Sequence, residues 1–237
     1  MTRLDKYLVD SGHFESRNRA LEAIKSGRVE VDNRVAKASL KVDSNSNIEI
    51  ENQKFYVSRA AKKLEGFLST HPIDIENKNA LDIGSSTGGF AQILLENKIS
   101  TLDCVDVGRD QLHHSLRGNP KLSLYEDTDI RSFEPSHIYD IITCDVSFIS
   151  ILQIIDHIDH LATINTDIII LYKPQFEVGR TAKRDSRGVV TDTHAIAKST
   201  EEFASYTTKL GWSLIHSTPS ILSGKEGNME YLYHLRK

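Results

Sequence analysis

From residue 58 onward, short apolar segments typical of buried strands alternate with longer segments of helical pattern. The strand segments are 80–84, 102–107, 122–126, 140–146, 167–172, 212–217 and 230–235, and the helical segments between them include 88–98, 149–162 and 195–211. Strands that alternate with helices pair mostly in parallel, and the helices cover both faces of the sheet. The alternation therefore predicts an α/β fold with a doubly wound sheet.

Residues 1–57 have a different pattern. Two short helical segments, 3–13 and 16–27, precede a hairpin around the turn Asp32-Asn33 and one more short strand. Ser16 can cap the second helix and Gly27 can end it. About 55 residues are too few to bury a large core. The sequence thus predicts a small α+β domain at 1–57, ending in a short linker at about 54–57, ahead of a large domain at 58–237.

The charge balance and the apolar runs restrict what the protein can bind. With 29 Lys and Arg against 33 Asp and Glu, the net charge of −4 argues against a uniformly basic coat, so nucleic-acid contacts would need local basic clusters. The longest apolar runs hold about five residues, against the roughly 20 needed to span a bilayer. No signal-peptide pattern opens the chain, and two cysteines predict buried free thiols in a reducing cytoplasm. The ten histidines show no metal-ligand spacing, so no metal is expected.

The first strand of the large domain runs into the turn "LDIGSSTGGF" at 81–90, and a helix follows directly. This arrangement lets backbone N–H groups approach a ligand. The turn lacks the Gly-Lys-Ser/Thr of a P-loop and the G-x-G-x-x-G spacing of dinucleotide sites. An acid at Asp82, small residues after Gly84 and a second strand-end acid at Asp106, able to bind a ribose diol, instead suit S-adenosylmethionine. The alternative is an ordinary tight turn with a surface Asp106.

The strands at 140–146 and 167–172 both end in charged residues. Asp145 and Lys173 share the carboxyl edge of the sheet if these strands are neighbours, and open parallel sheets bind their ligands at that edge. A lysine at the end of a buried strand needs a partner to receive its charge. The alternatives are that Asp145 caps the next helix and that the Lys173 amine reaches water.

The segment 58–68 and the last strand each carry one further charge of interest. On a helical wheel, the first segment has one apolar stripe, which consists of Ala60, Leu64, Phe67 and Leu68. Lys62 falls on the opposite face and is expected in solvent, whereas Lys63 flanks the stripe and can reach inward. Glu230 lies early in the last strand among apolar neighbours, so it needs a cationic partner unless that strand edge is exposed to water.

Six segments, in this order, resemble the TlyA (hemolysin A-type) ribosomal RNA 2′-O-methyltransferases, which are related to the FtsJ-type RNA methyltransferases. They are "SRAAKKL", "LDIGSSTGGF", "DVGRDQL", "CDVSFIS", "KPQFEVG" and "GNMEYLY". The N-terminal "RLDKYLV" and "SRNRALEAIKSGRVEVDN" look like the RNA-binding module named after the fourth small-subunit ribosomal protein. The resemblance implies a Rossmann-like class I methyltransferase sheet that follows a small α+β RNA-binding domain.

The family's catalytic tetrad Lys-Asp-Lys-Glu maps, motif by motif, onto Lys63, Asp145, Lys173 and Glu230. The resemblance implies that Lys173 orients and deprotonates a ribose 2′-hydroxyl, with Lys63 as the neighbouring cation. Asp145 would lie near the methyl donor, and Glu230 would position the hydroxyl or a lysine. The implied S-adenosylmethionine site consists of Asp82, Gly84, Ser85, Ser86, Thr87, Gly88, Gly89, Asp106, Asp129 and Asp145.

Two local basic clusters could contact RNA phosphates. The segment 173–187 holds five Lys and Arg against two acids, and residues 1–41 hold nine against six. The residues expected to bind RNA are Arg17, Arg19, Lys25, Arg28, Arg180, Lys183, Arg184 and Arg187. The alternative for each cluster is a solvated protein face.

The expected function is transfer of a methyl group from S-adenosylmethionine to ribosomal RNA, with rRNA or a ribosomal subunit as partner of a cytoplasmic monomer. The expected target is a cytidine of large-subunit rRNA, and small-subunit rRNA is a second expected substrate. The large subunit is favoured because the chain begins almost directly at "RLDKYL", without a basic extension. The alternatives are a non-catalytic ribosome-assembly factor, a small-molecule methyltransferase and a membrane-active hemolysin.

Overall fold

A computed structural model describes residues 1–51, 54–135 and 137–237. The chain forms two units, residues 1–55 and 56–237, and the boundary between them falls inside the expected linker at 54–57. Each unit is described by itself. No helix among the described residues has the length and apolar character needed to cross a membrane.

The first unit is a small α+β fold. Its elements are β1 (Thr2–Arg3), α1 (Leu4–Asp10), α2 (Arg17–Lys25), β2 (Val29–Val31), β3 (Arg34–Val35), β4 (Lys41–Val42) and β5 (Ile48–Ile50). Ser16 caps α2, as predicted, by accepting a hydrogen bond from the Arg19 amide. The β2–β3 hairpin turns at Asp32 and Asn33, whose positive φ angles of 53° and 62° suit a tight two-residue turn. The helices and sheets enclose a small core that includes Leu4, Leu8, Ile24 and Val29.

The second unit is the predicted α/β sheet. Its elements are α3 (Arg59–Thr70), β6 (Asn79–Ile83), α4 (Gly89–Glu96), β7 (Thr101–Val105), β8 (Leu122–Tyr125), η1 (Ile130–Ser132), β9 (Tyr139–Cys144), η2 (Ile151–Gln153), α5 (Ile155–Leu161), β10 (Ala162–Tyr172), α6 (Pro174–Glu177), α7 (Thr193–Lys209), β11 (Ser213–Pro219) and β12 (Tyr231–Arg236). The strand order is β11-β12-β10-β9-β6-β7-β8. β12 is antiparallel to both β10 and β11, and the other pairs are parallel.

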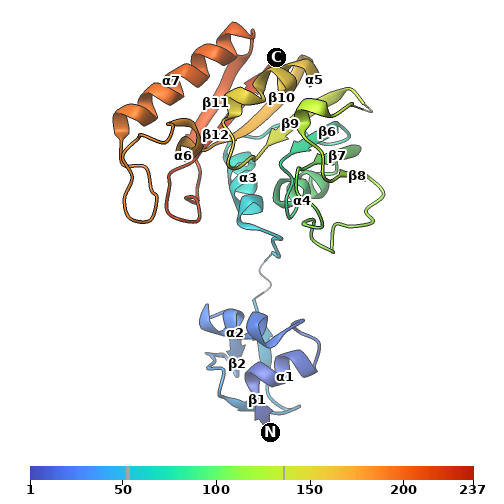
Figure 1. Cartoon of the computed structure of the whole chain (residues 1–237). Coiled ribbons are helices and arrows are strands. Elements are labelled where there is room, and N and C mark those ends of the chain that lie inside the picture. The colour runs from blue at the N-terminus through green and yellow to red at the C-terminus, as the bar shows by residue number, and fades with distance from the viewer. Residues whose placement is uncertain (52–53, 136) are drawn as a thin grey trace. The chain divides into compact units, whose positions relative to one another are not determined.

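Helices cover both faces of this sheet, as Figure 1 shows. Because successive side chains of a strand point to opposite faces, Ile141 of β9 packs in the cluster under α3 and α4, whereas Ile142 packs in the cluster under α5 and α7. The central strands β6, β7, β9 and β10 are therefore buried on both sides along most of their length, which is why they read as continuous apolar runs, whereas the edge strand β11 is largely exposed.

Many element ends differ from the sequence prediction by one or two residues, and three differences concern β10, the segment 149–162 and Glu230. β10 begins at Ala162 rather than 167, with a register shift against β9 between Ala162 and Asp167. The predicted helix at 149–162 divides into η2 and α5, because Ile154 has the non-helical angles φ −122° and ψ −7°. The last strand begins at Tyr231, so Glu230 lies just before β12 and not within it.

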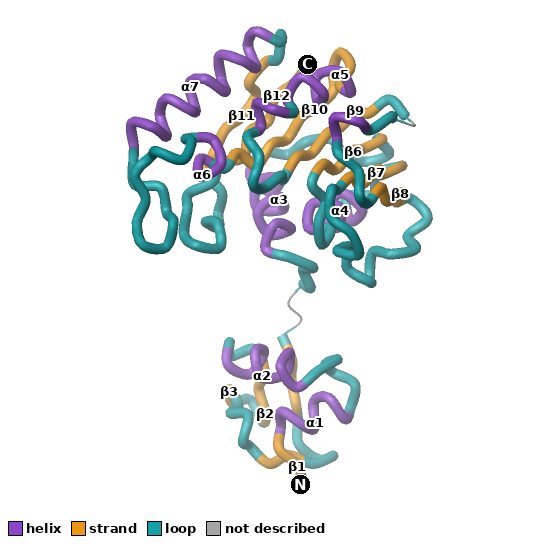
Figure 2. Tube along the Cα trace, viewed as in Figure 1, coloured by secondary structure: helices purple, strands orange, loops and turns teal. Residues whose placement is uncertain are grey.

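The strand order creates a switch point at the carboxyl ends of two central strands. β6 lies beside both β7 and β9, and the chain leaves β6 and β9 toward opposite sides of the sheet. Such a switch point leaves a crevice outside the carboxyl ends of the two strands. The loops after β6, β9 and β10 meet at this edge (Figure 2).

Candidate active site

A cavity of about 300 Å³ opens at this edge of the sheet. It is lined by the starts of α3 and α4, the end of β6 and the loops after β6, β9 and β10, with the residues Ser58, Arg59, Ala60, Asp82, Gly84, Ser85, Ser86, Thr87, Gly89, Phe90, Asp145, Ser147 and Lys173. Seven of the ten residues predicted to bind a cofactor therefore meet at one cavity. The other three are Gly88, Asp106 and Asp129, and they do not line it.

Two glycines in the β6–α4 turn are needed for different reasons. Gly84 has φ +75°, and a Cβ there would lie 2.9 Å from the Asp145 carbonyl oxygen, so glycine lets the ends of β6 and β9 approach closely. Gly88 has φ +87°, and a Cβ there would collide with the side chains of Leu112 and Leu116. The Gly88 position thus serves the turn into α4 and its packing rather than the cavity wall.

Asp82 is a fully buried carboxyl group at the base of the cavity. Its Oδ1 accepts a hydrogen bond of 2.7 Å from the Thr143 hydroxyl, while its Oδ2 has no hydrogen-bond partner among the described residues. Burial raises the pKa of Asp82 to about 7, and the hydrogen bond from Thr143 only partly opposes this effect. The site therefore holds a carboxyl group that changes charge near neutral pH.

Asp106 follows β7 directly and fastens two loops. Its Oδ2 accepts a hydrogen bond of 2.8 Å from the Ser86 amide, and its Oδ1 accepts one of 2.6 Å from the Gly108 amide. Asp129 accepts hydrogen bonds from Arg131, and the ion pair between these side chains measures 2.6 Å. The Arg131 guanidinium lowers the pKa of Asp129 to about 2. Both acids accept hydrogen bonds from the surrounding chain, and neither lines the cavity.

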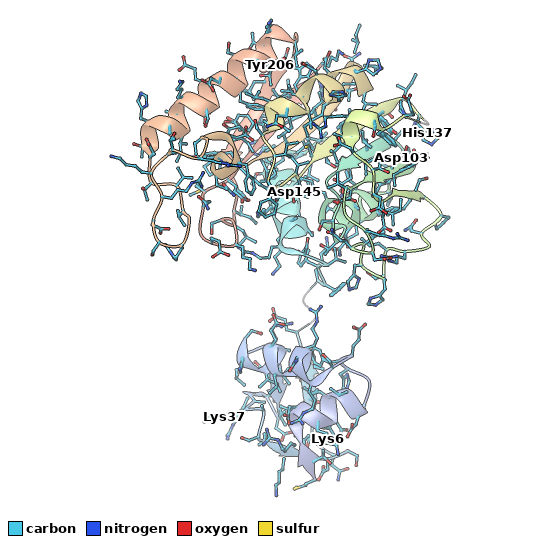
Figure 3. The ribbon with its side chains drawn as sticks, in the orientation of Figure 1. Lys6, Lys37, Asp103, His137, Asp145 and Tyr206 are labelled. Carbon is cyan, nitrogen blue, oxygen red and sulfur yellow. The ribbon has the colours of Figure 1, made fainter. Side chains whose placement is uncertain are left out.

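The four residues of the predicted tetrad form two ion pairs. Lys173 Nζ lies 2.6 Å from Asp145 Oδ1, and Lys63 Nζ lies 2.5 Å from Glu230 Oε2. All four side chains are at most 16% exposed. Burial raises the pKa of Asp145, and the charges of Lys173 and Lys63 oppose this effect. Figure 3 shows Asp145 near the middle of the unit, beside α3.

The two ion pairs answer the questions that the sequence left open. The charge of the lysine at the end of buried β10 is received by Asp145 at the end of the neighbouring strand β9, and Lys173 also donates a 2.8 Å hydrogen bond to Ser147. Glu230 is 3% exposed, which excludes the water-exposed alternative, and its cationic partner is Lys63. Lys62 is exposed, as predicted, and lies 5.2 Å from the ring centre of Tyr56.

Sequence reasoning missed several polar residues that the structure brings to this edge, and three of them are Ser58, Ser147 and Gln175. The Ser58 and Ser85 hydroxyls are buried, and neither has a hydrogen-bond partner among the described residues. These three residues lie inside the segments that carried the family resemblance, so those motifs were the available signal. No group of three or more His, Cys, Asp or Glu side chains within the described ranges could hold a metal ion.

An exposed aromatic side chain follows a residue of the cavity lining in the loop after β9. Phe148 is 92% exposed and has φ +66°, and it follows Ser147 in the loop after β9. Its ring centre lies 5.2 Å from that of Phe176, which is 6.0 Å from Lys173 Nζ. Two phenylalanine rings, tilted by 53° to each other, thus lie close to the cavity residue Lys173.

The basic residues predicted in the first unit lie on or next to α2. Arg17 forms a 2.6 Å ion pair with the buried Asp5, and Arg19 lies 5.2 Å from the ring centre of Phe55. Arg28 donates a hydrogen bond to Ser26, and Lys25 is exposed. Arg17 thus also stabilises the small fold itself.

In the second unit, the predicted cations lie in the loop between α6 and α7. Arg184 donates to the carbonyl oxygens of Gln175 at 2.9 Å and Gly179 at 3.2 Å, so it organises the loop. Arg187 pairs with Asp185 at 3.2 Å. The remaining two predicted cations, Arg180 and Lys183, are exposed.

Comparison with known proteins places both units in families. The model of the FtsJ-like methyltransferase family matches residues 56–237, and that of the S4 domain matches residues 2–48. The 23S rRNA (cytidine-2′-O)-methyltransferase TlyA of Campylobacter jejuni is 45% identical, over 94% of this chain and 94% of its own length. The 16S/23S rRNA (cytidine-2′-O)-methyltransferase TlyA of Mycobacterium tuberculosis is 35% identical, over 99% of this chain and 89% of its own length.

A solved structure is similar over the whole chain. The structure of a hemolysin from Streptococcus thermophilus has a TM-score of 0.73 and 31% sequence identity, and it covers 100% of this chain and 88% of its own. The two-unit architecture therefore recurs in a protein of related sequence.

Proposed function

The chain belongs to the FtsJ-like methyltransferase family, and we propose that it is an S-adenosylmethionine-dependent enzyme that methylates the ribose 2′-hydroxyl of a cytidine in ribosomal RNA. The observation that carries this proposal is the tetrad, in which two lysines and two carboxylates form two buried ion pairs, and the Lys173–Asp145 pair lines the cavity. A protein that only binds RNA has no need of two buried lysines, because buried charges are costly.

The cavity fits the proposed cofactor. Asp82 Oδ2 and the hydroxyls of Ser58 and Ser85 are buried and unpaired within the described chain, so they are ready to bind a ligand that carries an amine and a carboxylate. Asp106 directly follows β7, and a carboxylate at such a strand end can accept hydrogen bonds from a ribose diol. When bound, S-adenosylmethionine supplies a methyl group on a positively charged sulfur.

The residues of the chain then act on the ribose hydroxyl. Lys173 acts as a neutral amine, after its ammonium has given a proton to the Asp145 carboxylate 2.6 Å away. The amine orients the 2′-hydroxyl and takes its proton while the oxygen gains the methyl group. Asp145 and Ser147 hold the Lys173 amine at 2.6 and 2.8 Å. Lys63 supplies a positive charge near the oxygen, and the 2.5 Å contact favours a role for Glu230 in holding this lysine rather than the substrate.

We assign residues 1–57, including the linker at about 54–57, to RNA binding and residues 58–237 to methyl transfer, with both steps in the cytoplasm. The match to the S4 domain and the exposed cations around α2 support the first assignment. All four tetrad residues come from one chain, which supports a monomeric enzyme. Large-subunit rRNA is the proposed main substrate because the 45% identical relative bears a 23S rRNA activity in its name, and small-subunit rRNA is the proposed second one.

A methylation assay tests this function. Ribosomal subunits from a strain that lacks the gene are incubated with the protein and labelled S-adenosylmethionine, and 2′-O-methylated nucleotides are mapped. We expect a new mark on a cytidine of large-subunit rRNA. If the protein binds the subunits but leaves no mark, it is an assembly factor, and the proposed activity is wrong.

Cofactor binding should depend on pH through Asp82. The ionised carboxylate binds an ammonium group best, and the pKa of Asp82 lies at about 7 because of its burial. Lowering the pH from 8 to 6 should therefore raise the Kd for S-adenosylmethionine about tenfold, as protonation removes the binding-competent form. Calorimetric titration at both pH values measures this change.

The variant Asp82→Asn is the control for this effect, because burial also raises the pKa of the neighbouring Asp145. The variant should bind more weakly than the wild type and with the same Kd at pH 6 and pH 8. A tenfold change that persists in Asp82→Asn would assign the effect to another group.

RNA affinity should depend on the exposed cations of the α6–α7 loop. Each phosphate contact releases counterions, so Arg180→Ala or Lys183→Ala should lower the slope of log affinity against log salt by about one. Filter binding of rRNA fragments between 50 and 200 mM salt measures the slope. Lys209→Ala, at the far end of α7, is the matched control and should keep the wild-type slope. Equal slopes for all three variants would remove the loop from the RNA interface.

A further inference from the structure

One glutamine contacts the carboxylate of one of the two ion pairs of the tetrad. Gln175 lies in α6, two residues after Lys173, and its amide Nε2 donates a 2.9 Å hydrogen bond to Glu230 Oε1. The other oxygen of the same carboxylate, Oε2, receives Lys63 at 2.5 Å. Glu230 is therefore held from two sides, by a neutral donor and by a cation.

The orientation of the Gln175 amide follows from chemistry. A carboxylate only accepts hydrogen bonds, so the NH₂ group must face Glu230 and the amide oxygen must point away. That oxygen, Oε1, is buried and has no hydrogen-bond partner among the described residues. An unpaired buried acceptor weakens the fold, so stability of the core does not account for a glutamine at this position.

The surroundings restrict Glu230 further. A Cβ at Gly224 would lie 2.6 Å from Glu230 Oε1, so the backbone at Gly224 lies close to this oxygen. The Gln175 carbonyl oxygen accepts a 2.9 Å hydrogen bond from Arg184, which holds the end of α6 in place. Gln175 thus contacts Glu230 from a fixed backbone position.

We propose that Gln175 is a positioning residue for methyl transfer: its neutral amide fixes the Glu230 carboxylate, and through it the Lys63 ammonium, without adding a charge. This inference rests on the proposed function. A lysine at 175 would compete with Lys63 for the carboxylate, and a glutamate would repel it. Glutamine is the residue that donates at this distance while leaving the charges of the tetrad unchanged.

Two variants test this role by kinetics. Gln175→Leu keeps the size but removes the donor, so kcat should fall about tenfold while both KM values stay within about twofold. Gln175→Glu places two carboxyl groups within hydrogen-bond distance, and such a pair shares one proton with a strongly raised pKa. Its protonated form can still donate to Glu230, so kcat at pH 6 should stay within about threefold of the wild type.

The pH profile is the readout that a merely structural role would not change. As pH rises, Gln175→Glu loses the shared proton, and kcat should fall about tenfold or more by pH 8.5, giving a descending alkaline limb that the wild type lacks. The matched control is Gln153→Glu, the same change at an exposed residue of η2, which should follow the wild-type profile. Wild-type kcat in Gln175→Leu, or parallel profiles for Gln175→Glu and the wild type, would overturn the proposal.

A measurement without catalysis separates this inference from the proposed function. In Gln175→Glu the folded state retains a proton that the unfolded state releases above pH of about 4, so its stability relative to the wild type should decrease as pH rises. Between pH 6 and pH 8.5, the thermal midpoint of Gln175→Glu should decrease by about 3 °C or more relative to that of the wild type. If this difference in thermal midpoint is absent, the contact between Gln175 and Glu230 is disproved. If the difference is present but the protein methylates nothing, only the proposed methyltransferase activity is disproved.

Discussion

Replacing Lys173 by alanine should lower kcat for methyl transfer by about 10²–10⁴-fold, the range that a positioned acid or base contributes. The side chain is 10% exposed, lines the cavity and is held 2.6 Å from Asp145 and 2.8 Å from Ser147, so no nearby group can replace its amine. The Kd for S-adenosylmethionine should change little, because the loop after β6 is untouched. Single-turnover transfer to rRNA and cofactor titration measure the two quantities.

Lys173→Arg tests whether the charge or the proton transfer matters. Arginine keeps the positive charge but does not lose its proton in this pH range, so this variant should also fail. Lys209→Ala removes an exposed lysine from the end of α7 and should leave kcat unchanged. Wild-type rates in Lys173→Ala would remove this residue from the mechanism, and wild-type rates in Lys173→Arg would mean that a fixed charge is sufficient.

The sheet and one of the two ion pairs could be predicted from local sequence. β9 and β10 are apolar runs that end in Asp145 and Lys173, and neighbouring parallel strands bring their carboxyl ends together. The turn after β6 was recognisable from its glycines and small residues, and the structure brings most of it to the cavity. These features are encoded in short segments, and the alternation of strands and helices along the chain brings the ends of those segments to the same edge of the sheet.

The second ion pair could not be predicted from local sequence. Lys63 and Glu230 are 167 residues apart, and their contact depends on how α3 packs against the loop before β12. Hydrophobic periodicity also does not encode strand direction, so the antiparallel placement of β12 was not predictable. The helical wheel left Lys63 at the margin of the apolar stripe, and the partner carboxylate explains why it turns inward. The family resemblance was the signal that joined these four residues.

Removing one partner of the Lys63–Glu230 pair should destabilise the protein by about 3–5 kcal/mol, because an uncompensated charge then remains buried. The side chains are only 9% and 4% exposed, so water cannot replace the missing partner without local opening. Lys63→Met and Glu230→Leu keep similar volumes and each remove one charge. Urea unfolding of both variants and of the wild type measures the loss.

The double variant Lys63→Met/Glu230→Leu separates stability from chemistry. Two apolar residues of similar size replace a buried pair at little cost, so most of the lost stability should return, and the difference from the sum of the single variants gives the coupling. Methyl transfer should stay at least tenfold below wild type, since the positive charge beside the ribose oxygen is still missing. Full activity in the stable double variant would show that this pair only supports the fold. If the single variants Lys63→Met and Glu230→Leu are as stable as the wild type, then Lys63 and Glu230 do not form a buried ion pair.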